Sequence, residues 1–222
     1  MASSIVDVNG LKRQAVGYPE RVKVLMYHRI VADEELSEQA RDYAVHVGVL
    51  ANHLRTLERM GCTAVTFNDI ALYRRGELNL PRKPVVISFD DGYEDTYRLA
   101  FPLMKEYGMR GVVFALGDRS IRTNVWDTDH GITPATLMSE EQILEMHDAG
   151  FEIGSHSLTH RRLTELSRDE AWEEISRSRI LLEMTLNDTV RSFSYPYGLL
   201  NDQLRLLVRE AGYEFGCGVY SG

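Results

Sequence analysis

The chain has 222 residues, 44% of them hydrophobic, which is enough for one domain with a sizeable core. Its formal net charge of -8 argues against phosphate-backbone binding as the main activity, because nucleic-acid binders usually carry a basic face. The two cysteines, Cys62 and Cys217, have no metal-ligand spacing. They therefore predict neither a disulfide framework nor a thiolate zinc site.

The N-terminal segment, MASSIVDVNGLKRQAVGYPERVKVLMYH, contains no uninterrupted apolar stretch of the signal-peptide kind, and the chain contains no run of eighteen apolar residues. We therefore expect no membrane span and a cytoplasmic location, because export would need a signal that this sequence does not show. We expect residues 1–20 to be an N-terminal extension and residues 21–222 to form one domain.

Runs of strand-forming residues alternate with helical stretches along the chain. The predicted strands are VKVLMY (22–27), CTAVTF (62–67), PVVISF (84–89), RGVVFALG (110–117), FEIGSH (151–156), VRSFSY (190–195) and EFGCGVY (214–220). The predicted helices cover residues 48–61, 68–76, 93–108, 139–150, 167–185 and 201–212. We expect Pro102 to bend the third helix. This alternation predicts parallel βα units that close into a barrel or lie in a doubly wound sheet.

Polar residues gather where the predicted strands end. They are Tyr27 and His28, Asp90 and Asp91, Gly117 and Asp118, His156, and Tyr195 to Tyr197. In parallel α/β folds the carboxyl ends of the strands share one face, which carries the chemistry. We therefore expect these residues to meet on one rim.

Asp90 and Asp91 stand side by side at the end of an apolar strand, where their like charges repel. One explanation is that they cap the helix predicted over 93–108. The other is that a bound cation neutralises one aspartate and lowers its pKa while the second remains a free base. Because side chains alternate along a strand, one carboxylate can face a metal and its neighbour a substrate.

The segment His156-Ser157-Leu158-Thr159-His160 carries two imidazoles four residues apart. Both can bind one ion if the loop turns back, and a carboxylate from the neighbouring rim would complete a His/His/Asp set with positions open for water and substrate. Taken alone, the pair is explained equally well as ordinary loop histidines.

Three segments together resemble the first three motifs of the polysaccharide deacetylase family, the NodB-homology enzymes of carbohydrate esterase family 4. They are FDDG (89–92), HSLTH (156–160) and SYPYG (194–198). VLMYHRI and VVISFDDGY resemble in particular the branch of exopolysaccharide deacetylases that act on poly-N-acetylglucosamine. The likeness runs from about residue 22 to about residue 219. It implies that residues 21–222 form a catalytic domain folded as a distorted (β/α)7 barrel.

The resemblance also implies an activity and a cofactor. Members of the family remove acetyl groups from N-acetylated or O-acetylated sugars of a polysaccharide or oligosaccharide, using a divalent metal that is often zinc, with cobalt or nickel as alternatives. Carried over to this sequence, Asp90 is the catalytic base, while Asp91, His156 and His160 hold the metal. The backbone N–H of Tyr197 helps to bind the oxyanion.

We expect further contacts with the sugar from Tyr195, Pro196 and Trp126. Trp126 lies in the long polar loop 118–137, and an aromatic face there can stack on a pyranose ring. The alternative is that this segment is a mobile surface loop. We expect the charges of Arg161, Arg162 and Arg177 to Arg179 to lie on solvated faces and to be balanced by Glu173 and Glu174.

The sequence departs from the family pattern at two places. Ser194 stands where family members commonly carry an arginine that orients the base, although the related branch often has a small residue there. A later family motif supplies a histidine as general acid, but no histidine follows His160. Either the chain lacks its C-terminal end, or another group protonates the leaving atom. His28 is then the best internal candidate, because strand one should close next to the last strand.

Other classes of function fit less well. A haloacid dehalogenase phosphatase needs its aspartates as Asp-x-Asp, whereas Asp90 and Asp91 are adjacent. A hydrolase of cyclic amides would keep the barrel with an altered metal triad. The non-enzymatic alternative is a degenerate relative that binds metal or carbohydrate without turnover, which the missing C-terminal histidine favours.

Overall fold

Seven parallel strands form the centre of the molecule in the computed structural model, which describes residues 2–3, 5–7, 22–32, 43–130 and 134–219. They are β3 (Lys23–Tyr27), β6 (Thr63–Ala64), β7 (Pro84–Phe89), β8 (Val112–Ala115), β9 (Glu152–Ser155), β10 (Ser192–Ser194) and β11 (Phe215–Cys217). The sheet runs in the order β3-β7-β8-β9-β10-β11, and β6 pairs with the start of β7. The predicted strands are therefore confirmed as parallel neighbours.

The two ends of this curved sheet pair with the N-terminal segment. Strand β1 (Ala2–Ser3) runs antiparallel to β3, and β2 (Ile5–Asp7) runs antiparallel to β11. Strands β1 and β2 thus stand between β3 and β11, whereas the sequence predicts that β3 and β11 are direct neighbours. Both β1 and β2 belong to the segment expected as an extension, and the domain boundary at residue 21 stays a prediction. A second small parallel sheet pairs β4 (Arg29–Val31) with β5 (Ala44–His46).

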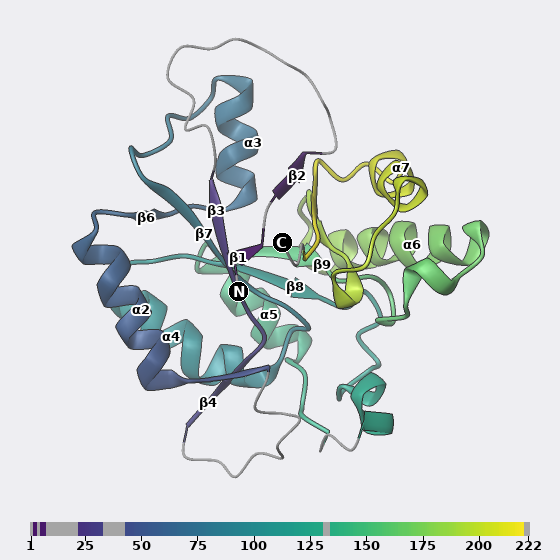
Figure 1. The fold of residues 1–222 in the computed structure, drawn as a ribbon, viewed down its shortest axis with the longest axis horizontal. Helices are drawn as coiled ribbons and strands as arrows, with labels where there is room; N and C mark the ends of the chain where they lie inside the picture. Colours follow the sequence, from purple (N-terminus) through teal and green to yellow (C-terminus); the bar gives the residue numbers. More distant parts are fainter. Residues whose placement is uncertain (1, 4, 8–21, 33–42, 131–133, 220–222) are drawn as a thin grey trace.

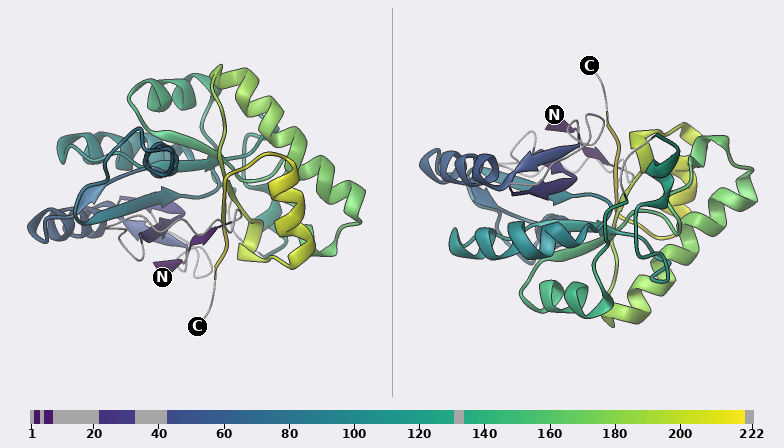
Figure 2. Two further views of the ribbon diagram at one scale, coloured as in Figure 1. Left: turned by 90° about the horizontal axis from the view of Figure 1, so that it is seen from above. Right: turned by 90° about the horizontal axis from the view of Figure 1, so that it is seen from below.

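Helices surround the strands (Figure 1). They are α2 (Val47–Arg59), α3 (Phe67–Arg75), α4 (Phe101–Glu106), α5 (Glu140–Asp148), α6 (Arg168–Leu186) and α7 (Asp202–Glu210). Seen from above and below, α2 and α4 lie at the opposite end of the molecule from α6 and α7 (Figure 2). None of the described helices combines the length and the apolar character that crossing a membrane requires.

The helix expected over 93–108 changes its winding at the proline. Residues Thr96–Ala100 form a π-helical turn, in which the N–H of Phe101 bonds to the carbonyl of Thr96, and α4 continues from Phe101. Pro102 has no N–H to donate, so the chain rewinds here instead of forming a regular helical turn. The expected irregularity at Pro102 is therefore a change from π to α winding.

Alternation along the strands separates two cores. Val24, Val86 and Phe114 belong to a cluster inside the barrel, which Phe67 of α3 also joins. Residues directly adjacent to these in the strands, such as Ile87 and Val113, belong to the larger cluster between the sheet and the helices. Because alternate side chains of a barrel strand point inward, the parity that buries Val86 also directs Asp90 toward the barrel axis.

The base of the barrel contains a buried carboxyl group, Glu152, which is 4% exposed. It accepts hydrogen bonds from Ser192 Oγ at 2.6 Å and from the N–H of Asn68 at 2.8 Å. Burial raises the pKa of Glu152 to about 7, against the lowering effect of these hydrogen bonds. Glu152 therefore joins the first turn of α3 to strand β10 at the end of the barrel opposite Asp90.

We expect Glu152→Gln to change how stability depends on pH. Since the folded-state pKa lies above the usual 4.5, the parent protein loses stability as pH rises from about 4.5 to about 7, whereas an amide cannot titrate. The free energy of unfolding, measured by urea denaturation from pH 4.5 to 8, should move in favour of the variant by up to about 3 kcal/mol. A difference that does not change with pH would show that Glu152 is already ionised at the lower pH.

Candidate metal centre

Three buried side chains converge at the carboxyl end of the strands. Asp91 follows β7, His156 follows β9, and His160 lies four residues further along the chain. One ligand atom from each lies within 4.8 Å of the others. Asp91 Oδ1 is 3.1 Å from Nε2 of both histidines. The structure therefore brings together the three residues that the sequence predicts as metal ligands.

The hydrogen bonding of this group shows that it suits a cation. His156 Nδ1 lies 2.9 Å from the carbonyl oxygen of Ser194, which can only accept, so Nδ1 carries a proton and Nε2 is the ring nitrogen that faces Asp91. Asp91 Oδ1 accepts no well-formed hydrogen bond from the described residues, and Nδ1 of His160 has no partner there. A bound cation would compensate the buried carboxylate of Asp91 and would bind the Nε2 lone pairs of the two imidazoles. The donor set fits zinc, which binds imidazole and carboxylate ligands.

Burial and the neighbouring charges shift the pKa of each of the three side chains. Burial alone would raise the pKa of Asp91, but the two neighbouring imidazoles outweigh burial and hold its pKa well below the usual range. Burial would lower the pKa of His156, yet Asp91 and Asp90 raise it overall. For His160, burial prevails and lowers the pKa. Asp91 is therefore ionised and His160 neutral near pH 7, the forms in which both bind metal.

The backbone around the ligands is unusual. Positive φ angles at residues other than glycine occur at five described positions, and four of them surround this site: Asp91 (72°), Ser157 (65°), His160 (66°) and Tyr197 (60°). Such conformations are uncommon for residues with a Cβ and gather at functional sites, where the surrounding structure imposes them. The positive φ at Asp91 also makes the chain leave the strand geometry, so Asp90 and Asp91 point in different directions.

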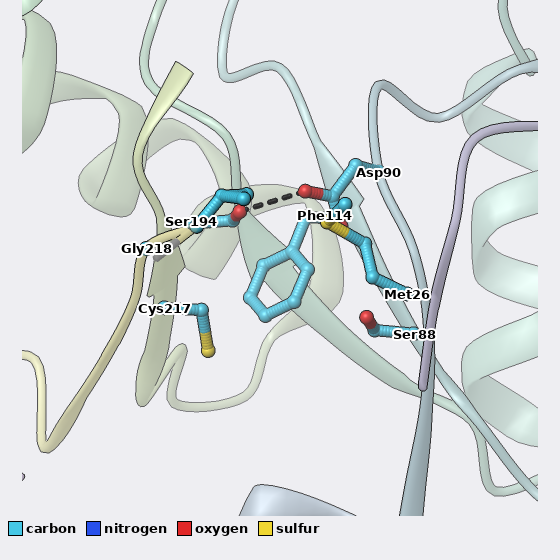
Figure 3. Close-up of a pocket in the computed structure, with 8 residues that line it drawn as sticks. Met26, Ser88, Asp90, Phe114, Ser194, Cys217 and Gly218 are labelled. Carbon is cyan, nitrogen blue, oxygen red and sulfur yellow. Dashed lines mark hydrogen bonds between the residues drawn. The ribbon is translucent and has the colours of Figure 1, made fainter. Parts of the chain in front are cut away.

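Asp90 lies beside the ligands and is held by the residue at the position of the family arginine. Ser194 Oγ donates to Asp90 Oδ2 at 2.8 Å, as Figure 3 shows, while Asp90 Oδ1 is buried without a partner among the described residues. The Asp90 carboxylate is thus oriented by a neutral hydroxyl group.

A cavity of about 10 Å³ borders Asp90 inside the barrel. Its walls include Met26, Ser88, Phe114 and Cys217 (Figure 3). This space admits about one water molecule and nothing larger.

The SYPYG segment divides between core and site. Tyr195 is 1% exposed and packs against Phe193, and Pro196 is also buried. The ring of Tyr197 instead contacts His160 with a centroid distance of 4.8 Å, and the guanidinium of Arg162 lies 4.0 Å above the Tyr197 ring. The segment thus reaches the metal ligands through Tyr197.

Trp126 packs directly on a ligand. Its ring stacks on His160 at a centroid distance of 4.2 Å and an interplanar angle of 20°. The loop that carries it is held by an antiparallel bridge between Thr123 and Thr136 and by the carboxylate of Asp127, which accepts from Asn124 Nδ2 at 2.9 Å. For the described residues of this segment these contacts favour an ordered wall of the site over a mobile loop, and His160 covers one face of the Trp126 ring.

His28 follows β3, next to the strand that carries the aspartates. Tyr27 pairs with Phe89, and the N–H of Asp90 bonds to the Tyr27 carbonyl at 2.9 Å, so His28 comes level with Asp90. Its ring packs edge-on against Tyr43 at 5.8 Å, and its field contributes to the lowered pKa of Asp91. His28 therefore lies near the two aspartates, at the end of the strand next to theirs.

One expectation about charge is wrong. Glu173 is exposed and pairs with Arg177, but Glu174 is buried at 4% exposure and accepts two hydrogen bonds from Thr159. The signal lay in the helix period, because Glu174 shares the buried face of α6 with Ala171 and Ser178.

Comparisons with known proteins agree with this geometry. The family model for polysaccharide deacetylase matches residues 77–216. YxkH of Bacillus subtilis, named as a candidate polysaccharide deacetylase, is 27% identical over 198 residues, which cover 89% of this chain and 64% of the relative. A poly-beta-1,6-N-acetyl-D-glucosamine N-deacetylase of Staphylococcus aureus is 23% identical over 189 residues, which cover 81% of this chain and 62% of the relative. The match thus covers less than two thirds of each relative's length.

The solved structure of the Streptococcus pyogenes deacetylase PplD in complex with acetate has a TM-score of 0.71 to this chain at 22% identity, covering 89% of this chain and 83% of that one. This likeness confirms the predicted fold, a distorted barrel of the deacetylase type. The family model matches residues 77–216 and therefore gives no support for a role of His28.

We expect His156→Ala and His160→Ala each to abolish stoichiometric binding of one divalent ion, because each removes one of three convergent donors. Metal content is measured by elemental analysis after chelation and reloading with zinc. His147→Ala is the matched control, since His147 lies on α5 and contacts Asp188 away from the site. Full occupancy in either ligand variant would remove that residue from the metal site.

Proposed function

The chain belongs to the polysaccharide deacetylase family, and from this premise we propose that it is a metal-dependent hydrolase that removes acetyl groups from N-acetylated sugars of a polysaccharide or oligosaccharide. The observation that carries the proposal is the convergence of Asp91, His156 and His160 beside Asp90, whose Oδ1 has no partner among the described residues. The Staphylococcus aureus relative is named as an N-deacetylase, which supports amide over ester substrates.

Asp91, His156 and His160 would hold the ion, which we propose to be zinc, with cobalt or nickel as alternatives. When bound, such an ion polarises a carbonyl oxygen and lowers the pKa of water. Asp90 then accepts the proton of the attacking water at Oδ1, while Ser194 holds Oδ2 in place. Water adds to the acetyl carbon, the C–N bond breaks, and acetate and a free amine leave.

We propose that the Tyr197 N–H donates to the oxygen that becomes negative during attack. The left-handed backbone at Tyr197 and the contact of its ring with His160 set this peptide beside the metal ligands. Removing one donor of an oxyanion hole typically costs about 3 to 4 kcal/mol of transition-state stabilisation. The mainchain donor is fixed by the turn, in which the N–H of Gly198 bonds to the carbonyl of Tyr195 at 2.8 Å.

His28 is our proposed general acid toward the leaving amine. His28 lies level with Asp90 on the neighbouring strand. This position supports the proposal, because the substrate can lie between the two groups. The sugar contacts proposed for Trp126, Tyr195 and Pro196 differ in support. Trp126 lies at the ligands, whereas Tyr195 and Pro196 are buried and would act by shaping the turn. The cytoplasmic location stays a prediction.

The proposal is tested by steady-state acetate release. Oligomers of β-1,6-linked N-acetylglucosamine are incubated with the protein loaded with zinc, cobalt or nickel, and acetate and free amine are measured together. We expect equal amounts of both products, and loss of activity with a chelator that the added metal reverses. Binding of the oligomers without release of acetate would instead identify a degenerate binding protein.

We expect Asp90→Asn and Asp91→Asn to fail in different ways. Asp90→Asn keeps the shape and all three metal donors, so metal content should stay near that of the parent while kcat falls by about 10²- to 10⁴-fold. Asp91→Asn replaces a charged ligand with a neutral amide, so metal affinity should fall first, and excess metal should restore part of the activity. A fully active Asp90→Asn variant, or one that loses metal while Asp91→Asn keeps it, would reverse the assigned roles.

A further inference from the structure

The two histidine ligands lie at the ends of a short loop with an unfavourable backbone. Ser157 and His160 both have positive φ angles, 65° and 66°. Residues with a Cβ adopt this conformation only where neighbouring contacts impose it. A loop that was free to relax would carry His160 away from His156, so something must hold it.

One side of the loop is held by the residues that follow strand β8. The N–H of Gly117 donates to the Ser157 carbonyl at 2.9 Å, and the N–H of Asp118 donates to the Leu158 carbonyl at 3.0 Å. Within the loop, Ser157 Oγ accepts from the N–H of His160 at 3.0 Å. These bonds hold the carbonyls of Ser157 and Leu158 and the N–H of His160, but they do not involve the N–H or the side chain of Thr159.

The other side of the loop is held by Glu174 of α6. Its Oε2 accepts from the N–H of Thr159 at 2.9 Å, and its Oε1 accepts from Thr159 Oγ1 at 2.5 Å. Both carboxylate oxygens thus bind the residue that directly precedes His160. Within the described part of the chain Glu174 forms no ion pair, so Thr159 is the partner that compensates its burial.

Attachment of α6 to the barrel does not need this carboxylate. Ser178 Oγ lies 2.7 Å from Ser155 Oγ, and Ile175 and Leu182 are fully buried beside it. A Cβ at Gly117 would lie 2.4 Å from Ser178 Cα, so α6 and the end of β8 are in backbone contact. The specific contribution of Glu174 is therefore to Thr159, and through Thr159 to His160.

We infer that Glu174 is a positioning residue of the metal centre, which fixes the backbone N–H and the side chain of Thr159, the residue directly before His160, so that the His160 ring stays aimed at the ion. Partners of this kind beyond the ligands typically change metal affinity by about 10- to 100-fold when they are lost. The inference rests on the proposed metal site, but it concerns metal binding and not turnover.

The test measures the dissociation constant of Co²⁺ by competition with a chromophoric chelator, and the visible absorption of the Co²⁺ protein, whose intensity reports ligand geometry. Glu174→Ala should weaken binding at least tenfold and change the absorption. Glu174→Gln should recover part of the affinity, since the amide oxygen still accepts the N–H of Thr159. Glu173→Ala is the matched control, one residue away on the exposed face, and should behave as the parent.

Unchanged Co²⁺ affinity and absorption in a folded Glu174→Ala variant would overturn the inference. If that variant does not fold, Thr159→Val decides the matter, because it keeps the shape and removes only the hydroxyl donor. Parent-like binding in Thr159→Val would then overturn it. A parent protein that binds Co²⁺ but releases no acetate from any sugar would refute the proposed function and leave this test unaffected.

Discussion

The site depends on a carboxylate and two imidazoles that are buried in one place. Asp91 Oδ1 lies 3.1 Å from Nε2 of both His156 and His160, and the carbonyl of Ser194 fixes a proton on Nδ1 of His156, so that Nε2 faces Asp91. Burial has removed water from Asp91 Oδ1 and from Nδ1 of His160, and neither has a well-formed hydrogen bond among the described residues. With a cation the facing atoms would form a ligand set. The surrounding structure therefore holds in place a group that a bound ion would stabilise.

Several parts of the molecule share that task. The strained backbone at Asp91 and His160 turns the ligands toward one another. Trp126 and Tyr197 pack on two sides of the His160 ring, so the imidazole cannot rotate freely even before metal binds. Preorganisation of this kind matters for catalysis, since geometry fixed in advance does not have to be reached during the reaction.

Ser194 links the two halves of the chemistry. Its carbonyl accepts a hydrogen bond from His156 Nδ1, and its hydroxyl donates to Asp90 Oδ2. One residue at the end of β10 thus orients both a proposed metal ligand, through its carbonyl, and the proposed base, through its hydroxyl.

The sequence alone determined the order of strands and helices and the nature of the ligand set. Short runs of strand-forming residues predicted which segments form strands, and FDDG and HSLTH placed carboxylates and imidazoles at strand ends. Sequence could not determine which distant groups meet there. Ser194 and Asp90 are 104 positions apart. The sequence predicts Glu174 as a solvated charge, whereas the packing of α6 against the barrel buries it. The closing strands β1 and β2 likewise depend on pairing with β3 and β11. Such contacts follow from how elements pack, which local patterns do not encode.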